Sequence, residues 1–221
     1  MKKVELIYVY DALCSWCYAI DKEIKVVQEK FKDQLKVNMI SGGMFIDDPS
    51  PRLLDLFPIQ GIRDAYARVS QLGAVPITEK YLDGLIEKEN YILDSRKTAI
   101  GFAVYKSMVA DRTKDLDFML IMQEGMYIDG LNPNTNDYYK QAAEKSGLDP
   151  ELFIKKMEEP QFEEDARRDF KYARDLKVTS YPQIFLKTND TQYFLLSKGY
   201  SNSDILVERI AKVLAEMGSE K

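Results

Sequence analysis

The stretch Tyr10-Asp11-Ala12-Leu13-Cys14-Ser15-Trp16-Cys17-Tyr18-Ala19 decides the fold of this chain. It holds the only two cysteines among 221 residues, and two residues separate them. An apolar run, Val4 to Tyr10, precedes it and predicts a strand. Apolar residues at helical spacing follow it and predict a helix from about Cys17 to Phe31. A Cys-x-x-Cys pair between a strand and a helix is typical of a redox-active dithiol.

The spacing of the cysteines suits a disulfide that opens and closes. Near the first turn of a helix, Cys14 and Cys17 lie on one face, within reach of the Cα separation of roughly 4.4 to 6.8 Å that a disulfide prefers. The free N–H groups and the dipole of the helix end stabilise an anion, so we expect Cys14 to attack as a thiolate. Cys17, one turn deeper between Trp16 and Tyr18, is expected to be less accessible and to resolve the mixed disulfide.

Two other interpretations of the pair are an inert buried couple and half of a zinc site. Structural zinc sites need about four ligands. The chain has no histidine and no third cysteine, so we expect no metal site, and we expect no cofactor.

Composition excludes several further classes of protein. With 45% hydrophobic residues, the chain has enough apolar side chains for a full core. The net charge of -5 and the lack of a basic cluster argue against a nucleic-acid partner, and no stretch is apolar enough to predict a membrane span. Met1 to Leu6 contains Glu5 and is followed by no small-residue cleavage site, so we expect a strand and a cytoplasmic protein. In that compartment a disulfide is usually catalytic or redox-sensing.

Strand signals occur only near the two ends of the chain. Leu35 to Ile40 predicts a second strand, parallel to the first, which places the cysteines beyond the carboxyl end of the first strand. From Gly61 to about Glu158 the pattern is helical only. A long helix then leads into the strand signals Ile184 to Leu186 and Tyr193 to Leu196, and a last amphipathic helix begins within Ser201 to Asp204.

This order of elements, with a Cys-x-x-Cys after the first strand and a proline opening the third, resembles the thioredoxin fold with a helical insertion, as in the DsbA family of thiol:disulfide oxidoreductases. The closest likeness is to the FrnE-like branch. Its Asp-x-x-Cys-Pro-Trp-Cys-Tyr motif is matched by Asp11-Ala12-Leu13-Cys14-Ser15-Trp16-Cys17-Tyr18, and its Ala-Arg-x-Leu-x-Val segment by Ala173-Arg174-Asp175-Leu176-Lys177-Val178. The resemblance spans essentially the whole chain. It implies an α/β protein in which residues 1–50 and 160–221 form a discontinuous thioredoxin-like domain and residues 51–159 an inserted α-helical domain.

The resemblance also implies roles for individual residues. Cys14 and Cys17 match the exchanging pair, and Pro182 matches a cis-proline that faces the disulfide. With a cis bond, Tyr181 would present its backbone to an extended peptide beside the attacking sulfur. The predicted substrate-binding residues are therefore Tyr181, Pro182, Trp16 and Ser180. An ordinary trans proline at the start of a strand is the other interpretation.

The chain departs from the family pattern at the pair itself. Ser15 replaces the usual proline, and no histidine lies between the cysteines, so thiolate stabilisation rests mostly on the helix end. A change of one unit in a thiol pKa is about 1.4 kcal/mol, which corresponds to about 30 mV in a two-electron couple. Modest differences in thiol pKa therefore reverse the preferred direction of the reaction. The sequence leaves that direction open.

Asp11, three residues before Cys14, has two interpretations. A carboxylate near the thiol could relay a proton during exchange. More often an aspartate at the end of a strand caps a turn or the following helix.

Three functions remain. The first is a thiol:disulfide oxidoreductase acting on protein or small-molecule thiols and disulfides, glutathione among them. The second is a glutathione-dependent enzyme that resembles kappa-class glutathione transferases or hydroxychromene carboxylate isomerases. Those enzymes typically carry a serine at the position of Cys14, so the cysteine favours the first function. The third is a non-catalytic adaptor that binds peptides in the same groove. The oligomeric state is not predicted.

Overall fold

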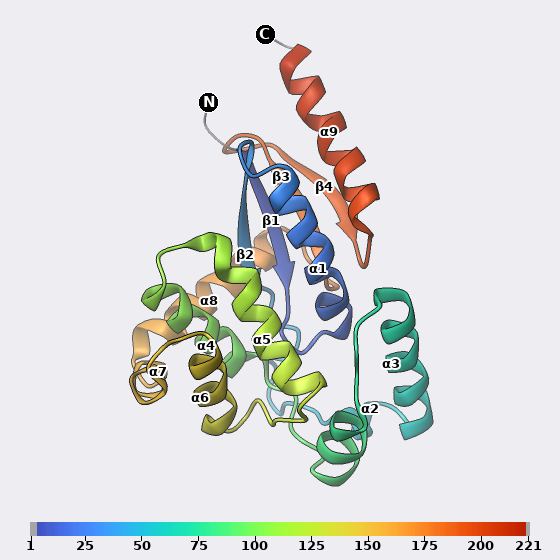
Figure 1. Cartoon of the computed structure of the whole chain (residues 1–221), viewed down its shortest axis with the longest axis vertical. Helices are drawn as coiled ribbons and strands as arrows, with labels where there is room; N and C mark the ends of the chain where they lie inside the picture. Colours follow the sequence, from blue (N-terminus) through green and yellow to red (C-terminus); the bar gives the residue numbers. More distant parts are fainter. Residues whose placement is uncertain (1–3, 220–221) are drawn as a thin grey trace.

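A four-stranded mixed sheet in the order β2-β1-β3-β4 forms the centre of the structure, a computed structural model that describes residues 4–219 (Figure 1). β1 pairs in parallel with β2 and antiparallel with β3, and β3 pairs antiparallel with β4. The predicted α/β architecture is confirmed, although residues 1–3 of the expected N-terminal strand lie outside the described residues. The strand bounds are β1 Val4–Tyr10, β2 Leu35–Ser41, β3 Gln183–Lys187 and β4 Tyr193–Lys198.

Helices cover both faces of the sheet, which explains why β1 is continuously apolar from Leu6 to Tyr10. On one face Leu6, Tyr8 and Tyr10 pack into the cluster that contains the inner side of α1. On the other face Ile7 and Val9 pack into the cluster that contains residues of α8. A strand buried on both faces reads as a continuous apolar run. The covering helices are α1 (Ser15–Lys30) and α9 (Ser203–Ser219) on the first face and α8 (Pro160–Asp175) on the second.

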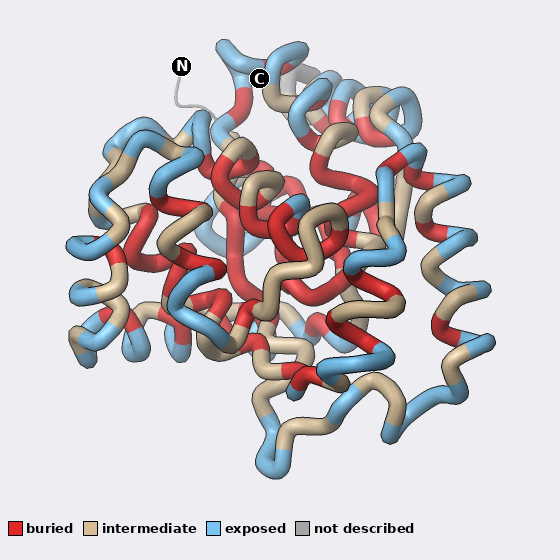
Figure 2. The backbone as a smooth tube through the Cα atoms, turned by 60° about the horizontal axis from the view of Figure 1, so that its bottom comes forward, coloured by how far each residue is buried: buried red, intermediate tan, exposed pale blue. Residues whose placement is uncertain are grey.

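The chain between β2 and α8 is helical, as the sequence pattern predicts. Its buried side chains, among them Phe102, Phe118 and Met122, join the same hydrophobic cluster as α1, so the core continues from the sheet into these helices (Figure 2). The division of the chain into two domains stays a prediction.

Within residues 4–219, no helix is both long enough and apolar enough to cross a membrane. The helices of this segment are α2 (Leu53–Leu56), α3 (Ile59–Gly73), the π-helix η1 (Lys80–Lys88), α4 (Ser95–Met108), the 3-10 helix η2 (Arg112–Lys114), α5 (Asp115–Tyr127), α6 (Asn136–Lys145) and α7 (Pro150–Met157).

Side-chain caps fix where several helices begin. The Asp94 carboxylate accepts a hydrogen bond from Arg96 N at the start of α4, and the Asp149 carboxylate caps α7. Asn202 Oδ1 accepts from Ile205 N at the start of α9, within the predicted start signal. Such caps satisfy N–H groups that have no partner inside the helix.

Candidate active site

Cys14 occupies the N-cap position of α1, and Cys17 lies in its first turn. Cys17 N and Tyr18 N both donate to Cys14 O, at 2.9 and 3.1 Å, so the helix begins at Ser15, earlier than the predicted start at about Cys17. Apolar spacing marks only the buried face of a helix, which is why it missed this turn. Both cysteines are unpaired; Cys14 is 7% exposed and Cys17 is 0% exposed.

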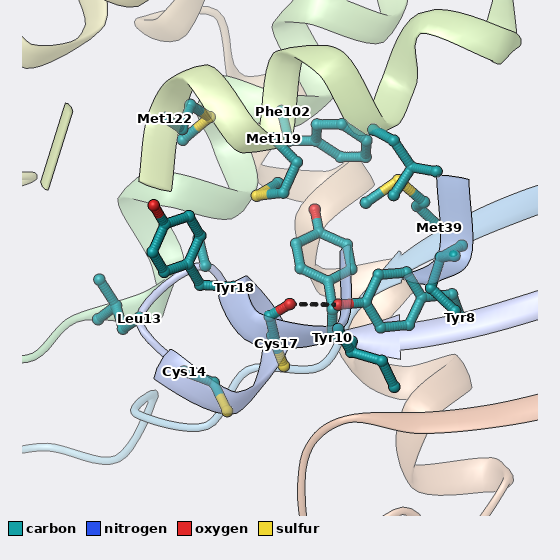
Figure 3. Close-up of a cluster of buried hydrophobic side chains, with 14 of the residues drawn as sticks. Tyr8, Tyr10, Leu13, Cys14, Cys17, Tyr18, Met39, Phe102, Met119 and Met122 are labelled. Atoms are coloured by element: carbon teal, nitrogen blue, oxygen red, sulfur yellow. Dashed lines mark hydrogen bonds between the residues drawn. The ribbon is translucent and has the colours of Figure 1, made fainter. Parts of the chain in front are cut away.

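The two sulfurs differ in their surroundings. Figure 3 shows both at the first turn of α1, pointing away from the tyrosines and methionines of the core. Burial, followed by the neighbouring Cys14, raises the pKa of the Cys17 thiol well above its usual value. Cys14 lies at the N-terminal end of α1, which is the positive end of the helix dipole. The arrangement gives Cys14 Sγ access to a partner and keeps Cys17 Sγ, which is buried, protonated.

Tyr181, in the loop before β3, faces Cys14 through its backbone carbonyl. The Tyr181–Pro182 peptide bond is cis, and Cys14 Sγ lies 3.7 Å from Tyr181 O. The Tyr181 hydroxyl donates to Gly42 O at 2.8 Å, and the ring lies so close to Gly42 that a β-carbon there would be 1.9 Å from it. Tyr181 is therefore held at both its backbone and its side chain.

A cleft of about 500 Å³ opens at Cys14. Of the predicted substrate-binding residues, Trp16, Ser180 and Tyr181 line it, whereas Pro182 is buried and does not line the cleft. Sequence reasoning missed most of the rest of the lining: Leu13 and Thr179 adjoin predicted residues, and the others come from segments distant in sequence. None of the described lining residues carries a charged side chain. The missed residues are Leu13, Gly43, Met44, Phe45, Leu53, Tyr66, Leu93 and Thr179.

The Asp11 carboxylate is directed at backbone amides. Its Oδ1 accepts from Leu13 N at 3.0 Å and its Oδ2 from Met44 N at 2.7 Å, while Asp11 N lies 3.5 Å from Cys17 Sγ. Burial raises the pKa of Asp11, and the bonds from these amides oppose the rise. The carboxylate thus joins the turn after β1 to the loop after β2, as the turn-capping interpretation expects.

A second buried acid, Asp21, was not predicted. It lies one turn after Cys17 on α1 and is fully buried. The Tyr8 hydroxyl lies 3.2 Å from Cys17 O (Figure 3). It also lies 2.5 Å from Asp21 Oδ1, and Asp21 Oδ2 has no hydrogen-bond partner. Burial raises the pKa of Asp21. The signal in the sequence was an acid beside Ile20 and Ile24 on the apolar face of the helix.

Comparisons with known proteins agree with this geometry. A protein-family model described as thioredoxin matches residues 8–208. The chain belongs to the thioredoxin family. This thioredoxin-family protein also has the fold of DsbA-like oxidoreductases, and the predicted resemblance to them is confirmed at the level of the fold. No curated protein sequence matches it significantly.

Three solved structures document the shared fold. A Nitrosomonas europaea protein named as a protein disulfide isomerase has a TM-score of 0.83 and 18% identity, over 97% of this chain and 99% of that chain. The cytosolic disulfide reductase DsbM from Pseudomonas aeruginosa has a TM-score of 0.76 and 19% identity, over 96% and 99%. A 2-hydroxychromene-2-carboxylate isomerase has a TM-score of 0.65 and 15% identity, over 98% of both chains. The fold is therefore common to the first two candidate functions, and the choice between them depends on the site.

Proposed function

We propose that this protein is a thiol:disulfide oxidoreductase in which Cys14 is the attacking sulfur and Cys17 the resolving sulfur. The observation that carries the proposal is the contrast within the pair. Cys14 lines the cleft at the end of α1, while Cys17 is fully buried behind it with a raised pKa. A partner disulfide can reach only the first sulfur.

The reaction follows from that contrast. The Cys14 thiolate attacks one sulfur of a substrate disulfide, a Cys14–S bond forms, and the substrate S–S bond breaks with its electron pair leaving on the distal sulfur. Cys17 then loses its proton and attacks Cys14 Sγ. The second substrate thiolate leaves, and a Cys14–Cys17 disulfide remains. The same steps in reverse oxidise a substrate dithiol.

The substrate contacts Trp16, Ser180 and Tyr181 in the cleft, and buried Pro182 acts by positioning Tyr181. The substrates are thiols and disulfides of proteins or small molecules. Glutathione is a candidate because DsbM, which has a similar fold, has a structure with GSH. The cytosolic location named for DsbM supports a cytoplasmic protein here.

The test separates the two sulfurs. Cys14→Ala is expected to abolish reduction of a peptide disulfide, whereas Cys17→Ala is expected to stop after the first step and accumulate a mixed disulfide on Cys14. Mass spectrometry under non-reducing conditions measures that adduct. An adduct on Cys17 in the Cys14→Ala protein, or full turnover by either variant, would show that the assignment is wrong.

The second candidate is a glutathione-dependent isomerase or transferase, which the shared fold with the hydroxychromene carboxylate isomerase favours. A Cys14→Ser variant distinguishes it. Such an enzyme would keep glutathione-dependent isomerase or conjugation activity with a hydroxyl at this position, whereas disulfide exchange would be lost. A peptide-binding adaptor would keep peptide affinity after loss of both thiols.

A further inference from the structure

A cluster of tyrosines contacts Leu13, the residue that precedes Cys14. Its members are Tyr18 of α1 and Tyr66, Tyr81 and Tyr127 from the helices after β2. Tyr127 stacks on Tyr18 with ring centroids 5.1 Å apart, and Tyr81 packs edge-on against Tyr127 at 4.9 Å and against Tyr66 at 5.2 Å. The Tyr127 hydroxyl donates to Leu13 O at 2.8 Å. Ring packing and this buried hydrogen bond fix the cluster relative to the start of α1.

Tyr66 is the member of this cluster that reaches the cleft. It is half-buried, it lines the cleft together with Cys14, and its hydroxyl oxygen lies 2.8 Å from the hydroxyl oxygen of Tyr81. Tyr81 is fully buried, so its hydroxyl needs partners, and the hydroxyls of Tyr66 and Tyr91 are both available to it. When Tyr81 donates to Tyr66, the proton of Tyr66 is free to point into the cleft.

Burial raises the pKa of both hydroxyls. Burial raises the pKa of Tyr66 to about 12, and the bond from Tyr81 opposes the rise. Burial also raises the pKa of Tyr81, and its bond to Tyr66 adds to that rise. Tyr66 therefore keeps its proton at neutral pH and can donate a hydrogen bond without ionising.

We propose that the Tyr66 hydroxyl donates a hydrogen bond to the substrate sulfur that leaves when Cys14 attacks. This inference rests on the proposed oxidoreductase function. In that step the Cys14–S bond forms and the substrate S–S bond breaks, so the electron pair and the negative charge pass to the distal substrate sulfur. Tyr66 stabilises that charge through its O–H group and keeps its proton, and the released thiolate takes a proton from solvent.

The residues that line the cleft offer few other donors to a leaving thiolate besides the Tyr66 hydroxyl. No described lining residue is charged, so no Lys or Arg of the lining can stabilise a leaving thiolate. The other phenol of the lining, Tyr181, already donates its proton to Gly42 O. A phenol is a stronger donor than the aliphatic hydroxyls of Ser15, Thr179 and Ser180, and a hydrogen bond to a charged acceptor is among the stronger ones.

The test compares two uncharged disulfides that release different thiols. 4,4′-Dithiodipyridine releases a stabilised, weakly basic thiolate, whereas bis(2-hydroxyethyl) disulfide releases a basic alkyl thiolate that depends more on a donor. We expect Tyr66→Phe to slow the reaction of Cys14 with the alkyl disulfide about tenfold, the size expected for a lost bond to a charged group. The rate with the pyridyl disulfide should change less than about twofold.

Two further variants control for structural effects. Tyr138→Phe removes another buried hydroxyl, one that donates to Met122 O and does not line the cleft, and should leave both rates unchanged. Tyr81→Phe keeps the Tyr66 hydroxyl but removes its donor, and should slow the alkyl reaction selectively by a smaller factor. Equal slowing with both disulfides, or no slowing in Tyr66→Phe, would overturn the inference. A wild-type protein that reacts with neither disulfide would instead refute the proposed function.

Discussion

Gly42 is the residue at which the fit around Cys14 is tightest. A β-carbon there would lie 1.9 Å from Cε1 and 2.6 Å from Cζ of Tyr181. The Tyr181 hydroxyl donates to Gly42 O, and the Tyr181 carbonyl faces Cys14 Sγ. The absence of a side chain at position 42 thus allows a residue of the loop before β3 to approach the reactive sulfur.

Gly42→Ala is predicted to displace the Tyr181 ring and break its hydrogen bond. Overpacking and a lost hydrogen bond each cost about 1 to 3 kcal/mol, so the free energy of unfolding should fall by about 2 kcal/mol or more. Exchange at Cys14 should also slow. Urea unfolding and the rate of reaction with a disulfide measure both effects. Gly84→Ala is the matched control, because nothing lies within 4 Å of a β-carbon there. A Gly42→Ala protein with wild-type stability would contradict the prediction.

Some residues of the site could be predicted from the sequence and others could not. Cys14 and Trp16 were predicted from the local spacing of the motif, and Tyr181 was predicted from the family resemblance. Tyr66 and Gly42 were not, because their contacts with the site join segments far apart in the chain. Local spacing carries no information on such contacts.

At the scale of elements, the turn between β1 and α1 is joined to the loop after β2 by Asp11. One carboxylate oxygen accepts from Leu13 N and the other from Met44 N. An asparagine has a single side-chain acceptor oxygen, so it cannot make both bonds. The substitution therefore separates a capping role from a proton relay.

Asp11→Asn is predicted to lower the free energy of unfolding by about 1 to 3 kcal/mol, because one buried amide loses its acceptor. If Asp11 only caps the turn, the exchange rate of the folded protein should keep its wild-type pH profile. A relay would instead remove one limb of that profile. Stopped-flow exchange measured across pH distinguishes the two. Asp33→Asn, at an exposed aspartate, should change neither stability nor rate.

Sequence patterns predicted most of the elements but not their backbone details. The strands were predicted from short apolar runs or alternation, and α1, α8 and α9 because each buries a face with a period of about 3.6 residues. The π-helix η1 was not, although its buried side chains include Tyr81 and Leu85. Its last turn is closed by a bond from Glu89 N to Gly84 O, a span of five residues that apolar spacing cannot distinguish from an α-helix.

The whole molecule buries several carboxyl groups and contains no histidine. These acids are Asp11, Asp21, Asp115 and Asp169. Burial raises the pKa of each of them, and that of Asp115 reaches about 6. Each group binds protons more tightly in the folded than in the unfolded chain. Between about pH 4 and the raised values, the folded state therefore holds more protons, and the free energy of unfolding should fall as the pH rises. No histidine titrates in the same window to oppose this trend.

Asp115 gives the trend a measurable size. Its side chain is 6% exposed, and burial raises its pKa to about 6, although the charges of Arg112 and Lys106 oppose the rise. At about 1.4 kcal/mol per pKa unit, its ionisation lowers the free energy of unfolding by on the order of 2 kcal/mol between pH 4 and pH 7. Asp115→Asn should therefore flatten the pH dependence of urea unfolding by that amount. Asp117→Asn, in the same helix but with a side chain 48% exposed, controls for the loss of a carboxylate from α5. A stability that rises with pH through this window in the wild type would mean that these carboxylates gain more from their partners than they lose on burial.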